Sequence, residues 1–230
     1  MGPTRTHQHA YHQRARGCRL GVILHLPQTT PDDRTVLGVH MESLKDAIRE
    51  RGVVLSERIL IVNSFLNHQV DTVLLDEIGR AFAGIFKECA PTKVMTAAVS
   101  GIPPALATGL HLGIPVIYAR KTRPSTMGGD VYRGTARSAT TQQVMDLIVK
   151  RPFLSPLDRI VIIDDFIAWG HTIKALCDII DASGATLVGI GAAIEKVFLN
   201  GRSQFEREDV PIHSLVRIRK MHPDGTIEFE

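Results

Sequence analysis

Arg159-Ile-Val-Ile-Ile-Asp-Asp-Phe-Ile-Ala-Trp-Gly-His-Thr172 runs from an apolar segment through two acids into a short loop. The four branched residues 160–163 are too few for a helix and do not alternate with polar residues. This pattern is typical of a strand in a parallel sheet that is covered on both faces. Asp164 and Asp165 follow at the predicted carboxyl end of the strand, where open α/β sheets bind their ligands. The sequence therefore predicts an α/β fold with a site at these acids.

The residues after the acids predict a loop from Phe166 to Gly170 and then an amphipathic helix over 172–183. Its apolar residues recur at the i, i+3, i+4, i+7 spacing of one helix face: Ile173, Leu176, Cys177 and Ile180. The first turn of such a helix carries unpaired N–H groups and a partial positive charge, which suit a phosphate.

A carboxylate pair does not suit a phosphate, but it accepts hydrogen bonds from sugar hydroxyls and it suits Mg²⁺. The pattern thus indicates a sugar-phosphate site, with the hydroxyls on Asp164 and Asp165. The phosphate would lie on the backbone of the loop, formed by Ala168, Trp169, Gly170, His171 and Thr172. The alternative is that the acids are only the solvated end of a strand.

This strand, acidic pair and small-residue loop resemble the motif by which type I phosphoribosyltransferases bind 5-phosphoribosyl 1-diphosphate (PRPP). Other segments extend the resemblance to the bacterial xanthine phosphoribosyltransferases, over residues 41 to about 218. They are Met41-Glu-Ser-Leu-Lys, Gly52-Val-Val-Leu-Ser, Ser64-Phe-Leu-Asn-His-Gln-Val-Asp71, Ser100-Gly-Ile, Ala119-Arg-Lys121, Ile163-Asp-Asp-Phe and Ile194-Glu-Lys196.

The resemblance implies a type I phosphoribosyltransferase fold, with a mostly parallel central sheet flanked by helices and a flexible hood and flap. It implies that xanthine and PRPP give xanthosine monophosphate (XMP) and pyrophosphate in purine salvage. Mg²⁺ would be held mainly by PRPP, without direct side-chain ligands. The enzyme is expected to be a cytoplasmic homodimer.

The resemblance also assigns roles to single residues. Asp164 and Asp165 would act in catalysis by holding the ribose. Xanthine would be bound by Leu60, Asn67 and Lys196, and PRPP by residues 168–172. Pyrophosphate would be bound by Ser100, Gly101, Arg120 and Lys121. Arg120 and Lys121 would reach the pyrophosphate in the neighbouring subunit.

Two departures from the resemblance concern the anion-binding loops. Trp169 and His171 stand where the xanthine enzymes carry smaller or amide residues, and Ala98 and Val99 match the pyrophosphate loop only in part. Because both loops are expected to bind through main-chain N–H groups, the binding itself should survive. Trp169 could stack, crowd the ribose or face solvent.

A basic, glycine-rich stretch follows residue 119. Its cations are Arg120, Lys121, Arg123, Arg133 and Arg137. A stretch of this kind inside a compact domain is either functional or disordered. Closing over the diphosphate, it would neutralise charge and exclude water; the alternative is a solvated surface loop.

Composition sets outer limits. A chain of 230 residues suits one α/β domain, placed at 41–230, and residues 1–40 are expected to be a disordered extension or a wrongly annotated start. The net charge of +3 does not argue for nucleic acid, and no apolar run is long enough for a membrane span. Three cysteines without metal or disulfide spacing indicate a reducing cytoplasm.

Two kinds of alternative remain open. The chain could be an adenine or guanine/hypoxanthine transferase, against which Ile194-Glu-Lys196 and Ser64-Phe-Leu-Asn67 speak. It could instead be a PRPP-sensing regulatory protein without turnover, although residues 1–40 are too short and unpatterned for a DNA-binding domain.

Overall fold

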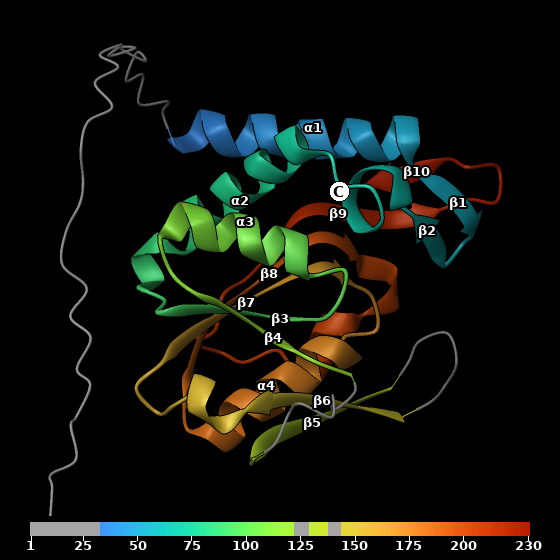
Figure 1. Cartoon of the computed structure of the whole chain (residues 1–230). Helices are drawn as coiled ribbons and strands as arrows, with labels where there is room; N and C mark the ends of the chain where they lie inside the picture. The colour runs from blue at the N-terminus through green and yellow to red at the C-terminus, as the bar shows by residue number, and fades with distance from the viewer. Residues whose placement is uncertain (1–32, 122–128, 138–143) are drawn as a thin grey trace, which may run out of the picture. The chain divides into compact units, whose positions relative to one another are not determined.

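The computed structural model describes residues 33–121, 129–137 and 144–230 (Figure 1). Its centre is a six-stranded sheet in the order β10-β9-β8-β7-β3-β4. Every neighbouring pair is parallel except β10 and β9, which confirms the mostly parallel sheet. The strands are β3 (Lys93–Ala97), β4 (Val116–Ala119), β7 (Arg159–Ile167), β8 (Thr186–Lys196), β9 (Ile212–Met221) and β10 (Ile227–Phe229).

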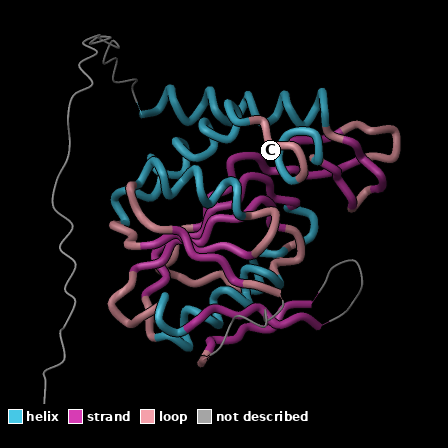
Figure 2. Tube along the Cα trace, in the orientation of Figure 1, coloured by secondary structure: helices cyan, strands magenta, loops and turns pink. Residues whose placement is uncertain are grey.

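Helices cover both faces of this sheet (Figures 1 and 2). One face carries α1 (Asp33–Arg51), α2 (Thr72–Phe86) and α3 (Ile102–Leu112), and the other carries α4 (His171–Ser183). Asp71, which the sequence indicates as a helix cap, does cap α2, because its side chain accepts a hydrogen bond from Leu74 N.

The central strand β7 supplies both hydrophobic cores. Val161 and Ile163 lie in the core beneath α1 and α2, whereas Ile160 and Ile162 lie in the core beneath α4, and all four are 0% exposed. Burying each such side chain contributes about 1.5–3 kcal/mol. The unalternated apolar run is thus explained by a strand that is buried on both sides.

Two hairpins flank the sheet. The first, β1 (Val53–Ser56) with β2 (Ile59–Ile61), leads into the short π-helix η1 (Asn63–Asn67), and these three elements are called the hood below. The second, β5 (Val131–Arg137) with β6 (Val144–Lys150), packs on α4.

The second hairpin corrects the prediction that the whole basic stretch is a loop. A Cβ atom built on Gly134 would lie 2.0 Å from the carbonyl oxygen of Ala175, so the glycine lets the strand lie directly on α4. Leu147 and Val149 are buried in the same core. Residues 122–128 and 138–143, which complete the predicted flap, lie outside the described residues.

Three other boundaries differ from expectation. From the sequence, residues 41–51 are expected to form a short helix that ends at Gly52; in the structure this helix begins at Asp33 and ends at Arg51. Strand β7 continues through both acids to Ile167, because its parallel pairing with β8 continues to Glu195. Residues 202–208 are expected from the sequence to form a surface helix, but the structure has only the 3-10 turn η5 (Gly201–Gln204) there. The extension before residue 33 is outside the described residues, and the domain limits remain a prediction.

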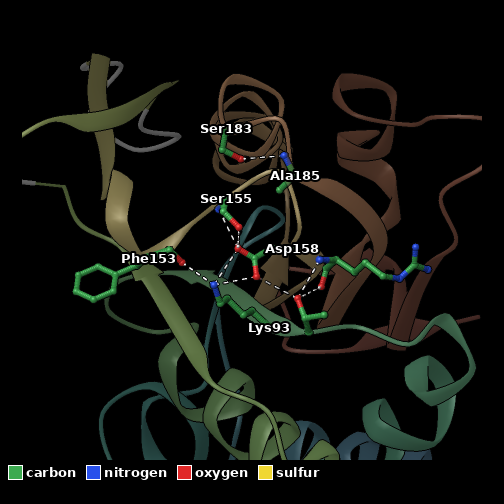
Figure 3. Close-up of polar contacts among 8 residues, drawn as sticks. Lys93, Phe153, Ser155, Asp158, Ser183 and Ala185 are labelled. Carbon is green, nitrogen blue, oxygen red and sulfur yellow. Dashed lines mark hydrogen bonds and ion pairs between the residues drawn. The ribbon is translucent and has the colours of Figure 1, made fainter.

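A polar cluster holds the amino ends of the central strands (Figure 3). Lys93 Nζ donates to Asp158 Oδ2 at 2.9 Å and to the carbonyl oxygen of Phe153 at 3.0 Å. Asp158 Oδ2 also accepts from Ser155 N at 2.8 Å. This cluster fixes β3 to the turn before β7, at the edge of the sheet opposite Asp164. None of the described helices combines the length and apolar character needed to cross a membrane.

Candidate active site

The two acids lie side by side in β7 beyond its last pair with β3, Met95 with Ile162. The exposed fractions are 4% for Asp164 and 6% for Asp165. The main-chain N–H of Asp165 donates to Asp164 Oδ1 at 3.0 Å. The acids are therefore at the carboxyl half of the strand, as the sequence predicts, but buried within it.

Burial, and then the charge of Asp165, raise the pKa of Asp164 well above its usual value. Burial also raises the pKa of Asp165, against the effect of a hydrogen bond from Ser100. Two adjacent buried carboxylates are costly to ionise together unless donors or cations surround them. The pair therefore favours a ligand that donates hydrogen bonds or brings positive charge.

The loop between β3 and α3 closes on the acids. The Ser100 side chain hydrogen-bonds to Asp165. A Cβ atom on Gly101 would lie 2.2 Å from Asp164 Oδ1 and 2.1 Å from Thr96 Oγ1, so only glycine fits there. Gly101 is also the N-cap of α3, where no described side chain caps the helix. The first turn of α3 offers few free donors, because residues 103 and 104 are prolines and Ile102 N donates to Val99 O at 3.1 Å. An anion beside the acids would therefore be bound by the main chain at Ser100 and Gly101, before the helix.

Residues 168–170 join β7 to α4 and lie against another turn. Gly170 is the N-cap of α4, with a left-handed φ of 80°. A Cβ atom on it would lie 2.1 Å from Gly201 O, and one on Gly201 would lie 2.2 Å from Ala168 O. Within the described chain, no side chain caps this helix, so its first N–H groups suit a phosphate.

Asn67 and Lys196 lie on the other side of the acids. Asn67 Nδ2 donates to Asp165 Oδ2 at 3.2 Å, whereas its buried Oδ1 has no partner among the described residues. Lys196 is 8% exposed, and its Nζ donates to the carbonyl oxygen of Arg58 at 2.8 Å. Burial lowers the pKa of Lys196 to about 8, against the attraction of Asp165. An acceptor and a cationic donor are therefore both set beside the acid pair.

Comparison with known proteins identifies the family. Residues 69–219 match the phosphoribosyl transferase domain family. A xanthine phosphoribosyltransferase of Moorella thermoacetica is 47% identical over 189 residues, which are 82% of this chain and 96% of that protein. One from Deinococcus deserti is 47% identical over 83% of this chain and 98% of that protein. The chain belongs to the xanthine phosphoribosyltransferase family.

Comparison with solved structures shows that this chain has the fold of the phosphoribosyltransferases. An adenine phosphoribosyltransferase from Rhodothermus marinus superposes with a TM-score of 0.65 at 24% identity, over 78% of this chain and 99% of that one. At this identity the likeness concerns the fold alone. The type I phosphoribosyltransferase fold predicted from the sequence is confirmed.

Not every residue that the family resemblance singles out faces the acids through its side chain. Leu60 lies in β2 with its side chain buried in the hood, 7% exposed. Arg120 lies on the ring of Tyr118 and donates to its hydroxyl at 3.1 Å, at the edge strand β4. Lys121 is nearer the site, because its charge lowers the pKa of Asp164.

The structure adds a residue that the sequence placed on the surface. Arg202 Nε and Nη2 donate to the two carboxylate oxygens of Glu195 at 2.7 and 2.6 Å. Glu195 Oε2 also accepts from Ser214 Oγ at 2.7 Å. Glu195 is therefore fixed as a structural anion, and Arg202 holds the strand end that carries Lys196. Sequence reasoning had no signal for this pair, because Arg202 reads as an ordinary cation after a glycine.

Proposed function

We propose that this chain transfers the phosphoribosyl group of PRPP to xanthine, forming XMP and pyrophosphate, the activity that its relatives' names indicate. The observation that carries the proposal is the position of Asn67, which donates to Asp165 and has a buried oxygen without a partner among the residues that the structure describes. That oxygen can accept from a ring N–H of an oxopurine, and Lys196 can donate to an oxo group. The ammonium group of Lys196 cannot accept from the amino group of adenine, so the pair favours an oxopurine over adenine. Among the oxopurines, xanthine is proposed from the names of the relatives.

The reaction joins a purine nitrogen to the anomeric carbon while the bond from that carbon to the pyrophosphate oxygen breaks. Pyrophosphate leaves with the bonding electrons, and xanthine reacts as its anion. Asp164 and Asp165 would hold the ribose hydroxyls and stabilise the positive charge that develops on the sugar. Residues 168–172 would hold the 5′-phosphate. Rate enhancement then comes from placement and charge, without a covalent intermediate.

The leaving group would be held at the other loop. The Ser100 hydroxyl and the main chain of Gly101 adjoin the acids, and Lys121 acts on Asp164 electrostatically. Arg120 is proposed to reach pyrophosphate in the neighbouring subunit. Leu60, whose side chain is buried, would contact xanthine through its main chain.

The acid pair also suits Mg²⁺, because two carboxylates beside substrate phosphates favour a divalent cation. PRPP would supply most of the ligands of the ion, and Asp164 and Asp165 would act on it through their charge, without ligating it directly. When bound, Mg²⁺ supplies positive charge to the departing pyrophosphate. The raised pKa values of both acids fit this arrangement, since a cation restores the ionised form.

A homodimer is supported by apolar side chains at the open edge of the sheet. The exposed fractions are 50% for Leu106, 74% for Leu110 and 40% for Tyr118. They lie on α3 and on β4, the last strand of the sheet. A second copy would cover this surface. We place the enzyme in the cytoplasm, which agrees with the free thiols of Cys89 and Cys177.

The test is pyrophosphate release from PRPP and Mg²⁺ with xanthine, guanine, hypoxanthine or adenine as the base. We expect xanthine to have the highest kcat/KM and adenine the lowest. Equal rates with adenine would end the xanthine assignment. No release with any base would favour a PRPP-sensing protein without turnover.

A further inference from the structure

Arg58 contacts two parts of the site at once. It lies in the turn between β1 and β2, and its carbonyl oxygen accepts the hydrogen bond from Lys196 Nζ at 2.8 Å. Its guanidinium carbon lies 5.9 Å from the centroid of the Trp169 ring. Lys196 belongs to the proposed base site and Trp169 to the proposed phosphate loop. One hood residue therefore connects the two.

The Arg58–Trp169 contact lies beside a cavity. A cavity of about 260 Å³ adjoins it, lined by both residues together with Glu57 and Phe198. Trp169 is 37% exposed and Phe198 is 39% exposed. No ion pair fixes Arg58 within the described part of the chain. Among the described residues, the contact with the indole is therefore the interaction that positions this guanidinium.

We propose that Arg58 is a positioning residue that couples recognition of the purine base to binding of the 5′-phosphate. The proposal rests on the function proposed above. A lysine ammonium has three N–H donors. One of them is directed to Arg58 O, which limits the directions in which the other two can donate to the base. The guanidinium of the same residue holds this hood turn to Trp169.

The coupling follows from this geometry. A phosphate on the N–H groups of residues 168–172 orders the loop that carries Trp169, and the indole in turn fixes Arg58. The hood turn then presents Lys196 in one orientation. By linkage, the base must favour phosphate binding by the same factor.

The chain provides its own probe, since Trp169 is its single tryptophan. Emission of the full-length protein is followed while ribose 5-phosphate, xanthine and both together are titrated. In the unsubstituted protein, we expect ribose 5-phosphate to change the emission and to lower the Kd for xanthine about 5-fold or more, the lower range of binding couplings. Arg58→Ala should reduce that factor to about 1, although each ligand alone still binds.

Controls separate coupling from general damage. Arg49→Ala removes a matched contact, since Arg49 lies 5.0 Å from the centroid of the Phe229 ring, and it should leave the factor unchanged. Arg58→Lys keeps a cation and should keep part of the coupling. In steady-state kinetics, Arg58→Ala should raise the KM for xanthine at saturating PRPP with little change in kcat.

The outcomes distinguish this inference from the proposed function. If the unsubstituted protein turns over xanthine but Arg58→Ala retains the full coupling factor, the positioning role is wrong. If the unsubstituted protein forms no XMP, the proposed function fails first. Should circular dichroism show that Arg58→Ala is unfolded, Arg58→Gln and Trp169→Phe decide: an unchanged KM for xanthine in both would overturn the inference.

Discussion

Asn67 and Asp165, 98 residues apart in the sequence, are joined by a hydrogen bond of 3.2 Å between Nδ2 and Oδ2. The bond connects the hood to the carboxyl half of the central strand. Since Asp165 adjoins the proposed ribose site and Asn67 the proposed base site, a single side chain places the two substrates relative to each other. In a reaction that depends on placement, such a contact affects both binding and turnover.

Asn67→Leu is therefore expected to raise the KM for xanthine and to lower kcat. The substitution removes the buried acceptor and leaves Asp165 without one donor, and a hydrogen bond to a charged group contributes about 1.5–3 kcal/mol. This corresponds to roughly a 10- to 100-fold loss in kcat/KM. Asn63→Leu, at an exposed position of the same short helix, is the control and should change neither constant. Equal kinetics of the two variants would remove Asn67 from the site.

We expect the buried acid pair to lower the free energy of unfolding at pH 7, where the enzyme is active. The pKa of Asp164 is raised above 3.8, its usual value, in the folded chain. At pH values between 3.8 and the folded pKa, the folded state therefore binds more protons than the unfolded state. Stability is therefore lost as pH rises through the folded pKa. Asp164→Asn should melt at a higher temperature than the unsubstituted protein at pH 7, and the difference should shrink toward pH 4, as followed by circular dichroism.

The same substitution should lower turnover at least 100-fold, because the neutral amide cannot stabilise the positive charge on the sugar. Asp165→Asn should also lose turnover while remaining folded. If either variant kept its kcat, that acid would not belong to the catalytic site. If Asp164→Asn were less stable than the unsubstituted protein at pH 7, burial of the two carboxylates would not be destabilising.

The parts of this site that are adjacent in the sequence could be predicted from the local sequence pattern. The apolar run before Asp164 and the helix after Gly170 depend on neighbouring residues, and both were predicted. Strand β7 was predicted too short because its last residues are held by pairing with β8, which no local signal reports. The contact of Arg58 with Lys196 spans 138 residues and uses a main-chain oxygen. No side-chain pattern could have indicated it.

Lys196 should give the reaction an upper pH limit. Burial lowers its pKa to about 8, so the ammonium donor is present below that pH and is lost as pH rises through it. We expect kcat/KM for xanthine to fall above about pH 8. Lys196→Arg remains charged and should shift the falling limb to higher pH, although its different geometry will lower the maximum. Because xanthine ionises identically in both assays, a limb that does not move would mean that Lys196 is not responsible.

The close approach of two turns predicts which glycine the phosphate loop needs. A Cβ atom on Gly201 would lie 2.2 Å from Ala168 O and 2.9 Å from Gly170 N, both main-chain atoms that cannot rotate away. Gly201→Ala must therefore push the loop toward the ligand. We expect the KM for PRPP to rise about 10-fold or more and the free energy of unfolding to fall by about 1–3 kcal/mol, the usual cost of overpacking.

Gly84→Ala is the matched control, because nothing lies within 4 Å of a Cβ atom built at that helical position. It should stabilise α2 by about 0.5–1 kcal/mol and leave the KM for PRPP unchanged. Urea titration and PRPP kinetics on both variants provide the comparison. If Gly201→Ala lost stability without a change in the KM for PRPP, the turn at 201 would support the fold alone, and the loop at 168–170 would not be where PRPP binds.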